Sequence, residues 1–280
     1  MTNLFIALFA YFIDKKFGEF RFIKHPIIII GELITFFEEK FYKRSIFVGL
    51  LLVLFVLSIT GSLSFALWLY LDYLPSWLNI LVSSFIASIF IAHNMLRSSV
   101  EGVLIAENKK AAIAMLVSRD TDEMTQSDIY KAAIETYAEN LSDGVVAPLF
   151  YLLLFGLPGI VIYKAINTMD SMVGYRNAKY ENYGKVAAKL DDFVNFLPSR
   201  LTALLIMLVS RKKPLLSFYK DGKKHDSPNA GHPITAMALA IDVTLGGDTS
   251  YFGEIKKKPN FGKGHKEIIQ EDVKKALNLI

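Results

Sequence analysis

The chain has 280 residues, of which 52% are hydrophobic and 21% are charged, and its formal net charge is +4. Its 21 Phe and 13 Tyr, with only 17 Gly and no glycine period, exclude a disordered chain, a collagen and a coiled coil. The absence of cysteine excludes disulfides, thiolate zinc sites, iron–sulfur clusters and a cysteine nucleophile. The mild positive charge fits either basic cytoplasmic loops or an anionic ligand.

The first 44 residues predict short helices that do not cross a membrane. The apolar stretch 4–13 is too short for a bilayer core, and it lacks the basic start and the cleavage site of a signal peptide. Together with the stretch 27–37, it is expected to form amphipathic or packing helices.

Residues 45–93 predict a transmembrane hairpin. Residues 45–71 carry no charge and exceed the roughly 20 residues that cross a bilayer, and residues 77–92 form a second uncharged run. Aromatic side chains flank the turn between them, as in an aromatic belt: Trp68, Tyr70, Tyr73 and Trp77. The turn at 72–76 has no Lys or Arg, whereas both flanks are basic, so the turn should face outwards and the flanks the cytoplasm. A buried helical pair in a soluble core is the alternative.

Residues 94–210 combine polar clusters with interrupted apolar runs. The run 145–163 contains Gly156-Leu-Pro158-Gly159, and Pro158 removes a helical hydrogen bond, which predicts a broken or re-entrant helix. Residues 211–280 are polar and predict a cytoplasmic tail that completes the site. We therefore expect an all-α, polytopic helical membrane protein with short, broken or re-entrant helices and cytoplasm-facing polar loops, forming one domain over residues 1–280.

A helix rich in carboxylates is predicted to start at Thr125, an N-cap with Asp128 at the capping-box position. Glu135, Glu139 and Asp143 recur every four residues, so they would lie along one stripe. Like charges at this spacing destabilise a helix by a few tenths of a kcal/mol each, and a divalent cation would offset that cost. A solvated acidic face fits the spacing equally well.

Three further polar clusters follow along the chain. Their members are Asn167, Asp170, Arg176 and Asn177; then Asp191, Asp192 and Arg200; then Ser227 and Asn229, followed by Gly246-Gly247. Polar residues near membrane depth are costly unless they face water or one another, which makes them functional candidates. Helix caps and interface anchors are the alternative. P-loop, dinucleotide-binding and zinc-protease motifs are absent from the sequence, and its basic and aromatic residues fit membrane anchors better than nucleic-acid contacts.

Several strings resemble, in order, the adenosylcobinamide-phosphate synthase family of cobalamin biosynthesis. They are Ser118-Arg119-Asp120 and the residues 135–151, 156–159, 163–175, 190–200, 227–231 and 245–251. Lys189 stands where the family pattern has Arg, and the Lys-rich end of the chain is longer than the pattern.

The resemblance implies a multi-pass enzyme of the cell membrane with its active site facing the cytoplasm. Such an enzyme uses ATP and Mg²⁺ to join adenosylcobyric acid to an aminoalkyl phosphate, by way of an acyl phosphate, and forms an amide. The amine is aminopropanol phosphate or ethanolamine phosphate, and the sequence does not distinguish them. Membrane lipid is an expected partner and nucleic acid is not, while a homo-oligomer and association with other late cobalamin-assembly enzymes stay open.

The same resemblance gives the polar residues expected roles. The metal ligands would be Glu135, Glu139, Asp143 and Asp170. The catalytic residues would be Glu135, Glu139, Asp191 and Asp192, the last two including a base for the attacking ammonium. Phosphates and substrate amides would be bound by Arg119, Arg176, Arg200, Asn140, Asn167, Asn177 and Asn229, with Ser227, Gly246 and Gly247.

Two other classes of function stay open. Broken helices and intramembrane carboxylates are also typical of secondary transporters, although no inverted repeat is visible in the sequence. A non-catalytic partner in corrinoid assembly is the second alternative, and it would not need the acidic stripe. If the protein is the ligase, the clusters on both sides of 145–163 must reach one cytoplasmic ATP, which favours a re-entrant or broken helix there.

Overall fold

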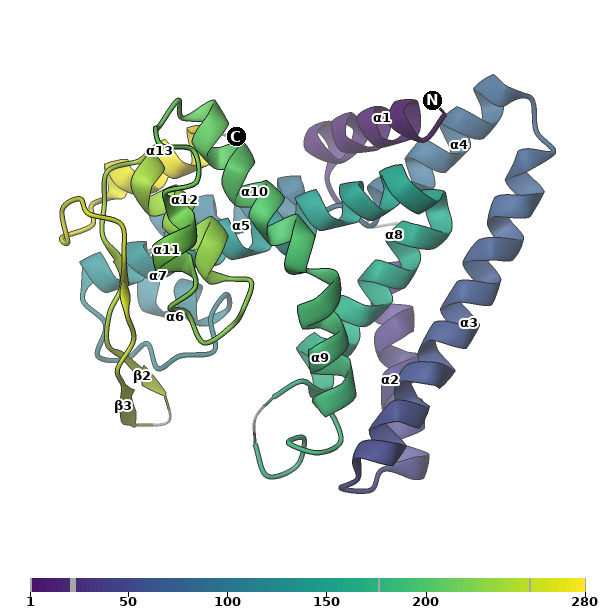
Figure 1. Cartoon of the computed structure of the whole chain (residues 1–280), viewed down its shortest axis with the longest axis horizontal. Helices are drawn as coiled ribbons and strands as arrows, with labels where there is room; N and C mark the ends of the chain where they lie inside the picture. The colour runs from purple at the N-terminus through teal and green to yellow at the C-terminus, as the bar shows by residue number, and fades with distance from the viewer. Residues whose placement is uncertain (1, 21–23, 176, 252, 280) are drawn as a thin grey trace. The chain divides into compact units, whose positions relative to one another are not determined.

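The computed structural model describes residues 2–20, 24–175, 177–251 and 253–279 (Figure 1). Contacts divide the chain into two compact units, each built from two separate stretches. Unit 1 comprises Met1–Asn94 and Ala147–Asn195, and unit 2 comprises Met95–Val146 and Phe196–Ile280. The expectation of a single membrane domain over residues 1–280, with segments 1–44, 45–93, 94–210 and 211–280, stays a prediction.

All the regular secondary structure of unit 1 is helical among its described residues. Its helices are α1 (Thr2–Phe17), α2 (Pro26–Phe41), α3 (Ile46–Asp72), α4 (Ser76–Ser88), α8 (Ala147–Val173) and α9 (Lys185–Val194). Helix α1 packs against α4, while α2, α8 and α9 pack against α3, as Figure 1 shows for the purple-to-teal helices. Apolar side chains from these four helices, including Ile34, Leu52 and Met169, form one buried core.

Helices α3 and α4 lie where the sequence predicts a transmembrane hairpin, and they are joined by a short turn and contact each other. The hydroxyl of Ser45 caps α3 by accepting a hydrogen bond from the N–H of Phe47. Helix α3 is apolar on all sides, and side chains such as Leu54 and Leu63 point outwards from the core. A helix that is apolar all round suits a membrane span.

Three helical stretches are long and apolar enough to cross a membrane among the described residues. They are Ile46–Asp72, Ser76–Ile105 and Gln126–Val173, and the bent pair α9–α10 gives a fourth if it is counted as one span. The protein is therefore an all-α, polytopic membrane protein, as the sequence predicts. The short helices expected before residue 44 are α1 and α2.

Helix α8 is broken at Gly156, as the sequence predicts for this run. Gly156 has φ 64° and ψ −153°, which no residue inside a regular helix adopts. Glycine reaches this region without the penalty that a Cβ would bring. Pro158 follows two residues later. Proline has no backbone N–H, so the break leaves no unpaired donor at this position.

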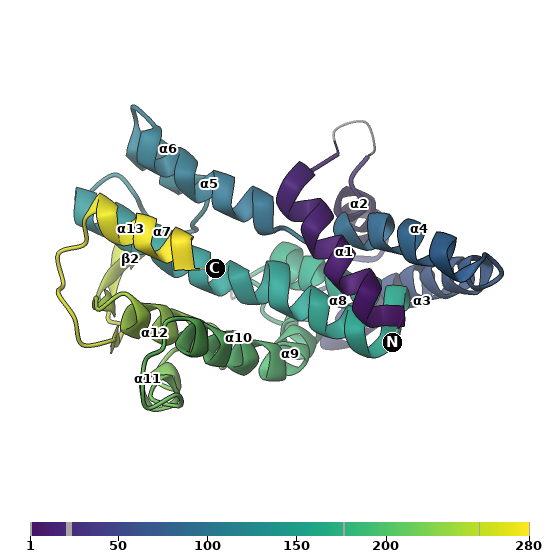
Figure 2. The same ribbon diagram turned by 90° about the horizontal axis from the view of Figure 1, so that it is seen from above.

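Unit 2 is built around α7 (Gln126–Leu141) and α12 (Gly231–Ala240). Helix α7 is capped as predicted, because Thr125 and Asp128 form both hydrogen bonds of a capping box. The other helices of the unit are α5 (His93–Ile105), α6 (Lys109–Ala114), the π-helix η1 (Ser142–Val146), α10 (Phe196–Val209), α11 (Phe218–Gly222) and α13 (Gln270–Leu279). Helices α6, α12 and α13 pack against α7, and Figure 2 shows α13 lying alongside it.

The C-terminal region is folded into unit 2. Helix α12 is apolar and almost wholly buried between α10, α11 and α7. Four short strands pair as two antiparallel ladders, β1 (Leu245–Gly246) with β4 (Asn260–Phe261) and β2 (Thr249–Tyr251) with β3 (Glu254–Lys256). Residues 211–280 therefore supply part of the core of this unit as well as polar loops.

Candidate functional site

Glu135 is the centre of a compact polar cluster in unit 2. Its Oε2 accepts a hydrogen bond from Nη2 of Arg119 at 2.6 Å, and its Oε1 accepts one from the N–H of Gly246 at 2.7 Å. Only 8% of the Glu135 side chain and 15% of the Arg119 side chain are exposed. We call Arg119, Glu135 and Gly246 the Glu135 cluster. Its carboxylate is satisfied by one cation and one backbone donor.

The charge of Arg119 is stabilised by this pairing. Burial lowers the pKa of the guanidinium, but the charge and the hydrogen bond of Glu135 outweigh burial, and the pKa is raised. Arg119 therefore keeps its positive charge beside the carboxylate of Glu135.

Gly246 must be glycine for the cluster to form. Its φ is 78°, and a Cβ at this position would overlap the carbonyl oxygen of Pro259. The backbone of β1 can thus approach both β4 and the carboxylate of Glu135. Gly247, with φ 90°, donates its N–H to the same Pro259 carbonyl at 3.1 Å. In this structure the backbone at the two glycines approaches Glu135 and Pro259, and the expected binding of a ligand by Gly246 and Gly247 stays a prediction.

The three carboxylates of the predicted stripe lie in different environments. Glu135 is buried, Glu139 is exposed and Asp143 is half-buried. Helix α7 ends at Leu141, and Asp143 lies in η1, whose wider turn changes the four-residue spacing. Asn140 is exposed and donates to the carbonyl of Thr136 within its own helix. The three carboxylates therefore do not share one environment, because Arg119 and Gly246 hold Glu135 in the interior, and their expected role as metal ligands stays a prediction.

Asp120, next to Arg119, forms a second anchor in unit 2. Its Oδ2 accepts hydrogen bonds from Oγ of Ser250 at 2.5 Å and from the N–H of Gly253 at 2.8 Å. The N–H of Asp120 also donates to the carbonyl of Ser250 at 3.0 Å. Asp120 thus holds the segment 246–253 at Ser250 and Gly253, whereas Arg119 reaches Gly246 only through Glu135. Sequence reasoning did not assign Asp120 a role.

Arg200 fastens the loop before α12 to α10. Its Nη1 donates to Oδ1 of Asn229 at 2.8 Å, and its Nη2 donates to the carbonyl of Pro228 at 2.9 Å. The guanidinium also lies over the ring of Phe196. Ser227 caps the same loop, because its hydroxyl accepts from the N–H groups of Asn229 and Ala230. The structure thus brings Arg200, Ser227 and Asn229 together, and their hydrogen bonds fix the loop before α12.

A buried polar network lies in unit 1, between α8 and α9. Asp191 accepts hydrogen bonds from Nδ2 of Asn195 at 3.0 Å and of Asn167 at 3.4 Å. The hydroxyl of Tyr163 donates to Oδ1 of Asn195 at 2.9 Å. Nζ of Lys164 donates to Oδ1 of Asn167 at 3.4 Å and acts electrostatically on Asp191. We call these five residues the Lys164 network.

The Lys164 network places Asn195 beside Asp191, which lies one helical turn earlier in the chain. It also contains a residue that the sequence analysis missed, since only 6% of Lys164 is exposed. Lys164 ends the long uncharged run 145–163, and an ionisable residue in such a place is a functional candidate by default. The position of Lys164 directly after this uncharged run could have identified it as a functional candidate.

The remaining predicted residues belong to α8, α9 and the loop between them. Asp170 and Asp192 are half-buried in α8 and α9. Asn177 is exposed, and its side chain accepts from the N–H groups of Lys179 and Tyr180, which makes it a turn residue. Arg176 lies outside the described residues. Of the four predicted metal ligands, Asp170 belongs to unit 1 and the other three belong to unit 2.

Comparison with known proteins decides the family. A protein-family model described as "CobD/Cbib protein" matches residues 7–280. The chain belongs to the CobD/Cbib family. No solved structure matches it.

Three curated relatives show what this CobD/Cbib chain is similar to. "Cobalamin biosynthesis protein CobD" of Halalkalibacterium halodurans is 38% identical, with 97% of this chain and 90% of the relative covered. "Probable cobalamin biosynthesis protein CobD" of Pyrococcus furiosus is 37% identical, over 96% of this chain and 91% of the relative. "Cobalamin biosynthesis protein CobD" of Listeria monocytogenes (serovar 1/2a) is 36% identical, over 97% and 91%.

The CobD/Cbib chain contains no preformed cluster of metal ligands within its described part. No group of three or more His, Asp or Glu side chains there is arranged to hold an ion. Mg²⁺ commonly takes one or two carboxylates and completes its shell with water and substrate phosphates. Glu139 and Asp143, the more accessible carboxylates of the predicted set in unit 2, fit that kind of site.

Proposed function

We propose that this protein is an adenosylcobinamide-phosphate synthase of cobalamin biosynthesis. It uses ATP and Mg²⁺ to join the amine of an aminoalkyl phosphate to a carboxylate of adenosylcobyric acid. The observation that carries the proposal is the family match over residues 7–280, together with relatives named for cobalamin biosynthesis over more than nine-tenths of this chain.

The reaction needs an activated carboxylate, because a free carboxylate does not react with an amine at useful rates. Transfer of a phosphoryl group from ATP makes an acyl phosphate and ADP. Attack by the amine then forms the amide and releases phosphate. Bound Mg²⁺ neutralises charge on the transferred group.

The chain offers residues for each part of this chemistry. Glu139 and Asp143 are the carboxylates that we assign to Mg²⁺. Asp191, with Asp192 beside it, is the carboxylate that we assign to the amine, since an ammonium must lose a proton before it attacks. Lys164 supplies a buried positive charge for an anionic group of a substrate.

The decisive experiment measures ATP hydrolysis by the purified protein in detergent, with and without cobyric acid and aminopropanol phosphate. Hydrolysis that needs both substrates and Mg²⁺, with an amide product of the expected mass, supports the proposal. A folded preparation that binds the corrinoid without hydrolysing ATP identifies a non-catalytic partner. One that shows neither property favours a transporter component.

We also propose that the loop after α8 faces the cytoplasm in the cell membrane. The chain has no cysteine, so a single introduced cysteine reports its own location. Ala178→Cys places a thiol in this loop without removing the ion pair between Lys179 and Glu38. Tyr73→Cys, in the exposed turn after α3, is the control for the outer face. Labelling of the Ala178→Cys variant from outside in intact cells contradicts this topology.

A further inference from the structure

Residues 211–224 form a strongly basic stretch of unit 2, which we call the basic segment. It contains six basic side chains and one acidic side chain within fourteen residues. The segment begins directly after α10 and contains α11, which packs against α12. Figure 2 shows α11 on the outer side of α12, away from α7. No member of the Glu135 cluster or the Lys164 network belongs to it.

Helix α10 leads into the basic segment and has an apolar outer face. Leu201, Leu205, Leu208 and Val209 share one face of the helix and are between 36% and 54% exposed. The opposite face packs against α12 and includes Ile206, which is fully buried. A helix at a water-exposed surface carries polar side chains on its outer face, whereas a helix in a membrane is apolar on that side as well. Helix α10 is part of a bent candidate span, and its outer face therefore fits contact with lipid chains.

Helix α10 ends at a sharp turn that the first residue of the basic segment forms. Arg211 has φ 57°, in the left-handed region. Its N–H donates to the carbonyl of Leu208 at 3.1 Å, and the N–H of Lys212 donates to the carbonyl of Met207 at 3.1 Å. This pair of hydrogen bonds is a Schellman motif, which ends a helix. The first two cations of the segment therefore lie within one turn of Leu208 and Val209, where the apolar face ends.

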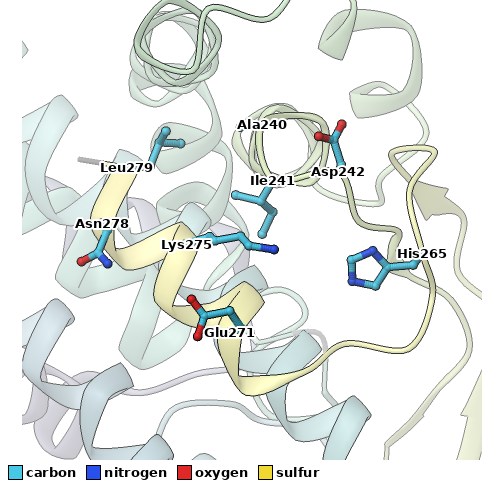
Figure 3. A pocket seen from close by; sticks show the side chains of 8 residues that line it. All are labelled: Ala240, Ile241, Asp242, His265, Glu271, Lys275, Asn278 and Leu279. Atoms are coloured by element: carbon cyan, nitrogen blue, oxygen red, sulfur yellow. The ribbon is translucent and has the colours of Figure 1, made fainter.

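Most of the positive charge of the basic segment is not neutralised by a neighbouring carboxylate. Lys212 pairs with Asp242 at 2.6 Å, and Lys224 pairs with Asp221 at 2.7 Å. Asp242 lines a pocket between the end of α12 and α13 (Figure 3), so its ion pair ties Lys212 to the body of unit 2. The four remaining cations are exposed and form no ion pair with a carboxylate within the described part of the chain: Arg211, Lys213, Lys220 and Lys223.

Two exposed apolar side chains lie among these four cations. Leu216 is 67% exposed and Tyr219 is 40% exposed. Nζ of Lys223 lies 4.2 Å from the centre of the Tyr219 ring, and the same ring stacks on the buried His232. Phe218 is buried, which fixes the segment to unit 2 between the two exposed side chains. Leucine and tyrosine beside lysines are typical of a segment that lies in the membrane interface.

We propose that the basic segment binds the headgroups of anionic phospholipids in the membrane that contains α10, with Leu216 inserted between them. The four cations without a carboxylate partner donate charge-assisted hydrogen bonds to the lipid phosphates. An anionic lipid surface attracts clusters of Lys and Arg next to a membrane helix, and this attraction acts only within about a Debye length. The direct continuity of the segment with α10 therefore favours a lipid over a soluble anion. This inference does not depend on the proposed reaction.

A spin label at position 216 tests the insertion. The chain has no cysteine, so Leu216→Cys carries a single nitroxide. In nanodiscs that contain phosphatidylglycerol, we expect this label to be more accessible to oxygen, which concentrates in lipid, than to a water-soluble nickel chelate. Ile269→Cys is the matched control, because Ile269 is also exposed in unit 2 but lies between Glu267 and Glu271, and its label should stay accessible to the chelate. Equal accessibility of the two labels to the chelate overturns the insertion.

The lipid preference of the full-length protein tests the charge. The purified protein in mild detergent is mixed with equal amounts of phosphatidylglycerol and phosphatidylcholine, and mass spectrometry measures which lipid stays bound. The wild type should retain an excess of phosphatidylglycerol. The double variant Lys220→Gln/Lys223→Gln should lose most of that excess, because each cation near an anionic surface changes the affinity about fivefold. Lys263→Gln/Lys266→Gln is the matched control, since it removes two exposed cations of unit 2 outside the basic segment, and it should keep the excess.

Two outcomes of this measurement overturn the proposal. Equal loss of phosphatidylglycerol from both double variants would show that net charge alone sets the preference. Inorganic phosphate should release the lipid no better than chloride at the same ionic strength, and stronger release by phosphate would identify a site for a soluble anion. Unfolding temperatures of the variants show that each is folded.

Discussion

The two units stabilise buried charge in different ways. In the Glu135 cluster of unit 2, a carboxylate and a guanidinium meet at 2.6 Å, and a backbone N–H completes the pairing. In the Lys164 network of unit 1, the carboxylate of Asp191 is held by two side-chain amides, and Lys164 bonds one of them at 3.4 Å. The first arrangement is a tight ion pair, whereas the second joins its charges through neutral groups.

This difference separates a structural role from a binding role. A tight buried pair must be broken, at a high free-energy cost, before either partner can bind a ligand. Amide groups can exchange partners more cheaply, because each carries both a donor and an acceptor. We therefore expect Glu135 to hold the fold of unit 2 and the Lys164 network to contact a substrate.

The largest effect is expected for Glu135→Gln. This change leaves the buried guanidinium of Arg119 without its counter-charge, and loss of one partner of a buried pair costs about 3–5 kcal/mol. The unfolding temperature of the variant in detergent should fall clearly, and activity should fall with it. A variant as stable as the wild type contradicts the structural role of the pair.

Glu139→Gln is the contrasting change, one turn further along α7. Glu139 is exposed, so its substitution should leave the unfolding temperature within error of the wild type. If Glu139 binds Mg²⁺ as proposed, turnover should be abolished while the protein stays folded. Near-normal turnover in this variant removes Glu139 from the metal site.

The second largest effect concerns Lys164 and Asp191. Each single change, Lys164→Met or Asp191→Asn, leaves a buried polar group poorly compensated and should cost about 2–3 kcal/mol. The double variant should lose less than the sum of the two, because removing both charges also removes the mismatch. A double-mutant cycle of unfolding free energies measures this coupling. Strict additivity would show that the two residues act independently.

Local patterns in the sequence predicted much of the fold. The uncharged runs gave α3 and α4, the Thr125–Asp128 pair gave the start of α7, and the Gly-Leu-Pro-Gly string gave the break in α8. These features depend on length, capping and backbone freedom, which neighbouring residues decide. The all-α membrane class follows from the same signals.

Long-range pairings in the site could not be predicted in this way. Glu135 and Gly246 are 111 residues apart, and Asp191 and Asn167 belong to different helices. Spacing along α7 suggested that Glu135 and Glu139 act alike, but Arg119 holds one of them in the interior. Which carboxylate meets a cation depends on how distant segments pack, and spacing within one helix does not contain that information.

A smaller effect tests the backbone of the Glu135 cluster. Gly246 and Gly253 both have positive φ, at 78° and 80°, but only Gly246 has atoms where a Cβ would lie. Gly253→Ala should therefore cost only the strain of a left-handed residue, about 1 kcal/mol. Gly246→Ala should cost about 1–2 kcal/mol more, since β1 must move away from Pro259 and Glu135. Equal unfolding temperatures for the two variants contradict the close approach at Gly246.

The smallest effect on stability near neutral pH is expected for His232. This side chain is buried in unit 2 and is uncharged there. Neither ring nitrogen has a hydrogen-bond partner among the described residues, and the ring stacks on Tyr219. Burial, followed by the charges of Arg200 and Lys223, lowers the pKa of His232 to about 4.

The unfolded chain takes up this proton near pH 6.5 and the folded chain only near pH 4, so stability falls between these values as the pH decreases. His232→Phe should reduce that loss in unfolding temperature between about pH 7 and pH 5. Unchanged pH dependence in the variant would show that the protonation of His232 is not linked to folding.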